Sequence, residues 1–79
     1  MNQNEYRTKD LYEAATIYTE NHRLLKGISR DGNICWFIFN DKAKAVCISD
    51  DYWARRIKVN AKEYAEAIRT LKERIFSVV

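Results

Sequence analysis

The sequence predicts a small α+β domain with helices packed on an antiparallel sheet. Three observations predict this class: a hairpin signal around Asp31, and helical spacing of apolar residues both before and after it. The expected order is helix, strand, strand, helix, short strand, helix. A chain of 79 residues forms one domain, which we place at residues 8–79. Residues 1–7 lack periodicity and are expected to form a disordered tail.

The hairpin is predicted from the pair Asp31-Gly32, which favours a two-residue type I′ loop. If Arg30 pairs with Asn33, Gly27 lies opposite Trp36 and leaves room for its indole ring. One face then carries Leu25, Gly27, Ser29, Ile34, Trp36 and Ile38, and the other carries Leu24, Lys26, Ile28, Arg30, Cys35, Phe37 and Phe39. Because the second strand is apolar on both faces, helices must cover at least one face.

Cap residues and apolar spacing place the helices. Thr8 is expected to cap the first helix, and Asn21 is expected to end it in the left-handed conformation. The apolar face of that helix, which should lie on the hairpin, carries Leu11, Ala14, Ala15 and Tyr18. Asp41 is expected to cap the second helix, and residues 49–51 either continue it or begin a new turn.

The last helix has the clearest start signal, because Asn60 is followed three positions later by Glu63, a near match to a capping box. Its predicted apolar stripe consists of Tyr64, Ala65, Ile68, Leu71, Ile75 and either Val78 or Val79. The preceding residues 57–59 alternate in polarity, and we expect them to form a short edge strand or an extended connector.

Composition restricts the classes of function. The net charge of +3 and the pI near 9.0 permit an anionic partner. No apolar run approaches the roughly 18 residues of a membrane span, and the polar N-terminus is no targeting signal, so a cytoplasmic location is expected. Cys35 and Cys47 have apolar neighbours, which is typical of small buried side chains in a reducing compartment. With His22 as the only histidine, neither a metal site nor a cofactor is predicted.

Enzyme chemistry is not expected either. A partly exposed residue at the start of a strand describes His22 better than a catalytic base does. Asp50 and Asp51 are adjacent, so their carboxylates point in different directions, and capping a turn explains them better. The two glycines are both used by the hairpin, which leaves no glycine-rich phosphate loop.

Three segments together carry a family resemblance: TKDLYEAA at residues 8–15, CWFIF at residues 35–39 and YAEAIRTLKERIF at residues 64–76. With these segments the chain resembles a family of small uncharacterised domains of unknown function encoded by bacteria, their phages and mobile elements. The resemblance covers most of residues 8–76, mainly at core and capping positions, and supplies no catalytic residue. It implies a small accessory protein and leaves the activity open.

Nucleic acid is the first predicted partner. Lys26 and Arg30 share a hairpin face with Phe37 and Phe39, and rings framed by cations hold single strands by stacking and phosphate contacts. A second basic and aromatic cluster runs from Tyr52 to Lys58. The predicted contact residues are Lys26, Arg30, Trp53, Arg55, Arg56 and Lys58. The alternative is structural: the phenylalanines form core under a helix, and the arginines interact with the end of the second helix.

A protein partner is the second prediction. A strand apolar on both faces, two tryptophans and an apolar C-terminal segment at residues 75–79 exceed what three short helices comfortably cover. Edge pairing of hairpins or packing of C-terminal segments across a two-fold axis would bury that surface in a homodimer. The alternative is a monomer whose sheet lies between helices.

Overall fold

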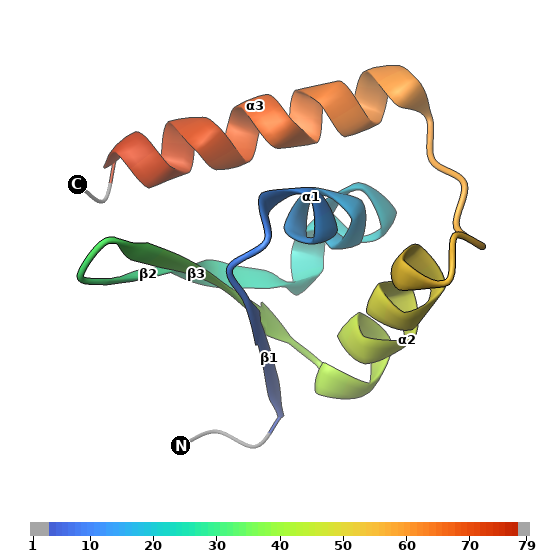
Figure 1. Ribbon diagram of the computed structural model, residues 1–79, viewed down its shortest axis with the longest axis horizontal. Helices are drawn as coiled ribbons and strands as arrows, with labels where there is room; N and C mark the ends of the chain where they lie inside the picture. Colours follow the sequence, from blue (N-terminus) through green and yellow to red (C-terminus); the bar gives the residue numbers. More distant parts are fainter. Residues whose placement is uncertain (1–3, 78–79) are drawn as a thin grey trace.

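The computed structural model describes residues 4–77 and shows three helices and a three-stranded antiparallel sheet, which confirms the α+β class (Figure 1). The elements are β1 (Glu5–Thr8), α1 (Leu11–Glu20), the 3₁₀ turn η1 (His22–Leu24), β2 (Leu25–Asp31), β3 (Ile34–Asn40), α2 (Lys42–Trp53) and α3 (Ala61–Ser77). The strand order β1-β3-β2 makes β3 the central strand. Residues 57–59, one predicted position of a third strand, connect α2 to α3 without regular structure.

The third strand is β1 instead, so the prediction of a tail is wrong for residues 5–7. Its backbone pairs antiparallel with β3, from Glu5 opposite Asn40 to Thr8 opposite Phe37. Four residues are too few to display the period of two that marks a strand. The backbone of β1 is ordered by its pairing with β3. The first three residues of the predicted tail lie outside the described residues.

The hairpin forms, but its loop is Gly32-Asn33, and Asp31 pairs with Ile34. Gly32 has a φ of 61° and Asn33 has no positive φ, which is the pattern of a type II′ turn with glycine first. The partner of each β2 residue therefore moves by two positions, an even number that keeps the predicted faces. A bulge at Lys26 exchanges the faces of two residues: Leu25 pairs with Phe39 and packs against the core, and Lys26 moves to the opposite face.

The two glycines have different structural roles. Gly32→Ala should lower the free energy of unfolding by about 1–2 kcal/mol, because alanine is strained at positive φ. Gly27 has no positive φ, and a Cβ built there meets no atom within 4 Å. Gly27→Ala should therefore leave that free energy unchanged or raise it. Urea denaturation of both variants tests the pair, and equal losses would contradict the assigned turn.

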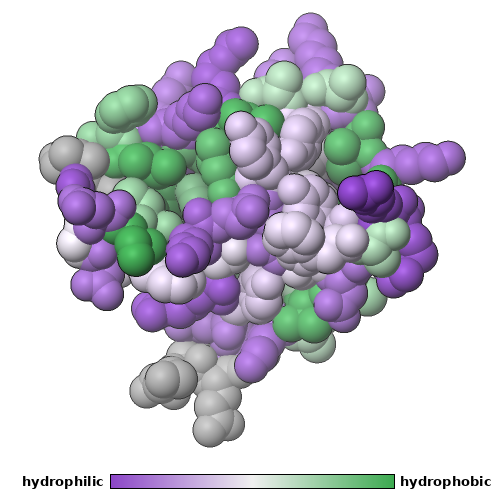
Figure 2. All heavy atoms as spheres, viewed as in Figure 1, coloured by the Kyte–Doolittle hydropathy of each residue, from purple (hydrophilic) through white to green (hydrophobic). Residues whose placement is uncertain are grey.

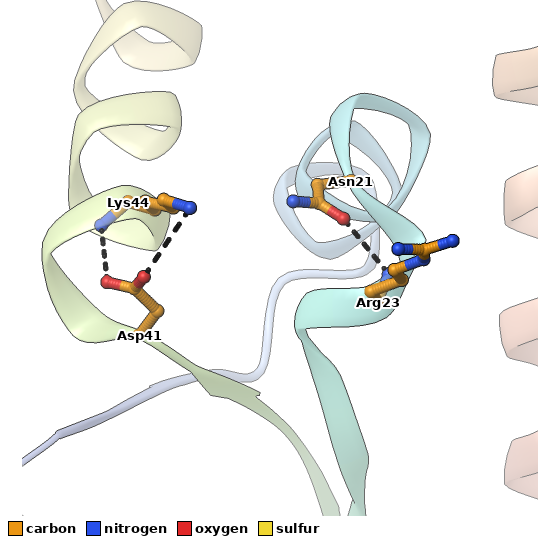
Figure 3. Close-up of polar contacts among 4 residues, drawn as sticks. All are labelled: Asn21, Arg23, Asp41 and Lys44. Carbon is orange, nitrogen blue, oxygen red and sulfur yellow. Dashed lines mark hydrogen bonds and ion pairs between the residues drawn. The ribbon is translucent and has the colours of Figure 1, made fainter.

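Polar caps fix the helix starts. Asp41 and Asn60 cap α2 and α3 as predicted, accepting hydrogen bonds from the backbone N–H of Lys44 (3.3 Å; Figure 3) and Glu63 (3.0 Å). The cap of α1 is Asp10 rather than Thr8, and the N–H of Glu13 donates to it at 2.9 Å.

The end of α1 also differs from the prediction. Asn21 has an extended φ of −157° rather than a left-handed conformation. Its side-chain carbonyl accepts from the N–H of Arg23 and begins the turn η1 (Figure 3). Residues 49–51, for which two interpretations stayed open, continue α2 without interruption.

The core forms where α1 lies between the sheet and α3 (Figure 1). Alanines on α1 permit this close packing on both sides. The buried apolar residues are Ala14, Ala15, Ile17, Leu24, Phe37, Phe39, Ala45, Ala67 and Leu71. On α3 the buried alanine is Ala67 rather than the predicted Ala65, which is exposed. Cys47 is exposed because Ala45 and Ser49 occupy the inner side of α2, so its predicted burial is wrong.

Helices cover only the face of the sheet that carries Phe37 and Phe39. The opposite face contributes no residue to the hydrophobic core among residues 4–77. We call it the open sheet face; its residues are Glu5, Arg7, Lys26, Gly27, Ser29, Asp31, Ile34, Trp36, Ile38 and Asn40. Lys26 belongs to it because the bulge lets its Nζ pair with the Glu5 carboxylate. The predicted monomer with helices on both sides of the sheet is therefore not the arrangement found.

Candidate functional site

A buried carboxylate links three elements of the fold. Glu13 of α1 is only 3% exposed. Its Oε2 accepts hydrogen bonds from the hydroxyls of Tyr6 on β1 (2.6 Å) and Ser49 on α2, and its Oε1 accepts from the Thr8 hydroxyl (2.5 Å). Hydrogen bonds from neutral hydroxyl groups thus stabilise the negative charge of the carboxylate without a paired cation.

Burial alone would raise the pKa of the Glu13 carboxyl. Hydrogen bonds from Ser49, Thr8, Tyr6 and Trp53 outweigh burial and hold that pKa below its ordinary value. The carboxylate is therefore ionised at neutral pH and has its acceptor oxygens occupied. It stabilises the packing of β1, α1 and α2, and it is too enclosed to reach a substrate.

Aromatic side chains gather on the surface above this network. Trp53 is 61% exposed and Tyr12 is 55% exposed, although both rings are large and apolar. The ring of Tyr52 meets Trp53 edge to face, with centroids 5.0 Å apart. Tyr64 of α3 donates a hydrogen bond to the carbonyl oxygen of Tyr12 at 3.4 Å. We call these residues, Tyr12, Tyr52, Trp53 and Tyr64, the aromatic surface.

The surroundings of Tyr52 indicate that the aromatic surface is one region. Burial raises the pKa of the Tyr52 phenol, and the nearby ionisable groups Asp10, Tyr64, Glu13 and Tyr12 raise it further, so residues of all three helices lie close to that ring. Figure 2 shows residues of intermediate hydropathy, a range that tyrosine and tryptophan share with serine, threonine and glycine, in the middle and right of the face shown. More apolar residues lie mainly to their left.

A hollow of about 350 Å³ lies at the end of α2, lined by Tyr52, Trp53 and Arg55. Arg55 has a φ of 61°, a left-handed conformation that costs a non-glycine residue about 1–2 kcal/mol. Glycine is the usual residue at such a helix end. Arginine is therefore less favourable than glycine for the backbone at this position. Its guanidinium group lines the hollow together with the rings of Tyr52 and Trp53.

The predicted contact residues fall into two groups. Trp53, Arg55, Arg56 and Lys58 are all exposed and follow one another at the end of α2 and in the connector to α3. The Arg56 guanidinium pairs with the Asp51 carboxylate, through Nη2 at 3.1 Å and Nε at 3.3 Å. Among residues 4–77 no carboxylate pairs with Arg55 or Lys58.

Lys26 and Arg30 lie on β2 and do not form the predicted hairpin site. Lys26 pairs with Glu5, and the Nε of Arg30 donates to the carbonyl of Gly32 at 2.9 Å. Phe37 and Phe39 are 1% and 0% exposed, so neither ring is available for stacking. The structural alternative holds here because the helices cover this face. Gly27 lies opposite Ile38 rather than Trp36, so it makes no room for the indole.

The sequence predicts no place in this region for Tyr12, Tyr64 or Glu13. Tyr12 lies off the predicted apolar stripe of α1, which is the local signal of an exposed tyrosine. Glu13 carries no such signal, because its hydroxyl partners are far away in sequence.

A groove of about 440 Å³ between α1 and α3 offers a different chemistry. Its lining includes His22, Glu63 and Glu66 together with hydroxyl side chains. Two carboxylates do not suit an anionic ligand. Within the described part of the chain, no group of three metal-binding side chains occurs. Among the described helices, none is long and apolar enough to cross a membrane.

Comparison with protein-family models, curated proteins and solved structures finds no match to this chain. The resemblance to a family of small phage and bacterial domains therefore stays a prediction.

Proposed function

We propose that this chain is a non-enzymatic binding module that holds single-stranded nucleic acid by stacking a base on Trp53 and contacting phosphate with Arg55. The observation that carries the proposal is the hollow where an exposed indole, the edge of Tyr52 and an unpaired guanidinium meet. Aromatic rings combined with cations are the usual means of holding single strands. An accessory role in phages or mobile elements is supported only by the family resemblance.

Trp53 hydrogen-bonds Glu13, yet 61% of the residue remains exposed and is available to a base. Stacking of a base on an aromatic side chain contributes roughly 1–3 kcal/mol, and it tolerates any sequence because every base has a π-face. The contact with Tyr52 holds the indole in one orientation, which reduces the entropy lost on binding. A base in a duplex is already stacked on its neighbours, so the proposal favours single strands.

The charges around the hollow predict modest affinity. Arg55 and Lys58 are available for phosphate, whereas Asp51 neutralises Arg56. Two phosphate contacts to a single strand imply that the logarithm of the binding constant falls with that of salt concentration with a slope of roughly −1.4. We therefore expect binding that is measurable at low ionic strength and weak at physiological salt.

Replacement of Arg55 by glycine separates binding from folding. Arg55→Gly relieves the left-handed backbone and should raise the free energy of unfolding by about 1 kcal/mol. It should weaken binding several-fold and reduce the salt slope by roughly 0.7, because one phosphate contact is lost. Fluorescence anisotropy with labelled single-stranded and duplex 12-mers at two ionic strengths measures both quantities.

Two further variants complete this experiment. Trp53→Ala should weaken single-strand binding roughly 5- to 100-fold, the equivalent of one stacked base. Arg69→Ala removes an exposed cation of α3 and should change affinity by less than about twofold. The proposal is wrong if no binding occurs at low salt, or if Arg69→Ala weakens binding as much as Arg55→Gly does.

A further inference from the structure

We infer that the open sheet face binds the same face of a second copy of the chain, with Arg7 of each copy beside Asp31 of the other. The inference goes beyond the proposed function and does not depend on it, because Trp53 and Arg55 lie at the end of α2 rather than on the sheet. It assigns the predicted homodimer to a surface other than the hairpin edges or C-terminal segments expected from the sequence.

An apolar stripe forms the centre of the open sheet face. It consists of Ile34, Trp36 and Ile38, which alternate along the central strand β3. Ile34 is 40% exposed and the other two are half-buried, and none of the three packs against the hydrophobic core of residues 4–77. Two sheets that pack face to face bury stripes of this kind against each other.

The charges on this face cancel, and half of them are unpaired. Glu5 and Lys26 form an ion pair with each other. Arg7 and Asp31 are exposed, and neither forms an ion pair within residues 4–77. A face with equal numbers of acidic and basic residues attracts neither a polyanion nor a polycation, but it can be complementary to itself.

The strand register places the two unpaired charges symmetrically about Trp36. Arg7 stands opposite Ile38, on the β1 side of β3. Asp31 stands opposite Ile34, on the β2 side. Because these isoleucines lie two positions after and two positions before Trp36, the strand spacing and rise put each charged residue about 8 Å from it. Arg7 and Asp31 therefore mark the ends of one diagonal, with Trp36 at its midpoint.

This arrangement is self-complementary under two-fold symmetry. An axis that lies between two such faces, passes over Trp36 and runs perpendicular to the diagonal exchanges its two ends. Each Arg7 then lies over Asp31 of the other copy, and the contact occurs twice because a two-fold interface is isologous. The two indoles meet at the axis, where offset stacking of rings is favourable. The strands of the two sheets would cross at roughly 70°, near the orthogonal class of sheet packing.

The size of the face sets the strength of the dimer. Three strands about 4.8 Å apart, the longer two with seven residues each, give a footprint of roughly 300 Å². Stable interfaces bury about 800 Å² per partner, so we expect a weak dimer that dissociates on dilution. Because exposed ion pairs are screened by salt, its dissociation constant should rise with ionic strength.

Charge reversal tests the pairing directly. Arg7→Asp brings two acidic residues together at each contact, and Asp31→Arg brings two basic residues together. Each single variant should raise the dissociation constant at least about tenfold, whereas the double variant restores both pairs in reverse and should recover most of the affinity. Sedimentation equilibrium from about 20 μM to about 1 mM measures these constants. The double exchange Glu20→Arg with Arg69→Asp, at exposed positions of α1 and α3, is the matched control and should change the constant less than about twofold.

The fluorescence of Trp36 locates the interface without a change of charge. Trp53→Phe leaves Trp36 as the sole indole, because the chain has two tryptophans. Its emission should shift to shorter wavelength as the protein concentration rises, since the half-buried ring becomes enclosed between two sheets. Trp36→Phe leaves Trp53, whose emission should not depend on concentration.

Each outcome decides the inference. A chain that stays monomeric at about 1 mM would overturn it, and so would a dimer that is unaffected by either reversal, because such a dimer uses another surface. Failure of a folded double variant to recover affinity would overturn the pairing of Arg7 with Asp31. If a reversal unfolds the chain, the emission of Trp36 decides instead, and a constant emission would overturn the inference. None of these results bears on single-strand binding at Trp53, so the proposed function is tested separately.

Discussion

Glu13→Ala is expected to lower the free energy of unfolding by about 3–5 kcal/mol, the cost of removing one side of a buried charged network. The hydroxyls of Tyr6, Thr8 and Ser49 all donate to this carboxylate, and the substitution would leave them without their acceptor. A small domain has only about 5–15 kcal/mol of stability in total. Urea denaturation monitored by circular dichroism measures the loss.

Matched variants show whether the network, rather than the charge, is responsible. Glu20→Ala removes an exposed glutamate from the same helix and should cost less than about 0.5 kcal/mol. Ser49→Ala removes one donor while the carboxylate keeps its other donors, so its cost should lie near 1 kcal/mol. If Glu13→Ala and Glu20→Ala had equal effects, the carboxylate would not hold the three elements together.

The same carboxylate should make stability depend on pH. The folded-state pKa of Glu13 lies below the ordinary value of 4.5, because hydrogen bonds to the ionised form outweigh burial. Its stabilisation is therefore complete above the unfolded pKa and is lost as the pH falls through the folded pKa. Glu13→Gln, which cannot titrate, should flatten this acid-side decline when urea midpoints are compared between about pH 7 and about pH 3.

The parts of the fold that the sequence predicted are those with local signals. The caps Asp41 and Asn60 act on backbone groups three residues away, so their signal lies in the adjacent sequence. Strand β1 has no such signal, because four residues gain their order from pairing with β3, more than 25 positions along the chain. The turn differed by one position since Asp-Gly and Gly-Asn are both good hairpin pairs and overlap at Gly32.

Only those residues of the candidate site that are close together in the sequence could be predicted. Trp53, Arg55 and Lys58 are close in sequence, and their alternation of aromatic and basic residues identified them as a cluster. Tyr12 and Tyr64 join that cluster through helix packing, which no local pattern reveals. The open face of the sheet was undecidable from β3 alone, because Trp36 and Phe37 are equally apolar. The packing of α1 buries Phe37, whereas Trp36 on the opposite face stays partly exposed.

Phe39→Ala should cost about 3–5 kcal/mol, because the side chain is fully buried where β3 meets both of its neighbours. Its strand partners are Tyr6 and Leu25, which both pack against the core, so the chain has little freedom to fill the cavity. Loss of this ring would also withdraw support from the edge strand β1, where Tyr6 donates to Glu13.

Ile38→Ala is the matched control on the neighbouring position of the same strand. Its side chain points to the open sheet face and is already partly exposed, so truncation leaves no cavity and should cost about 1 kcal/mol. The difference between the two unfolding free energies therefore measures which face of β3 the helices cover. Equal costs would mean that both faces of β3 are covered.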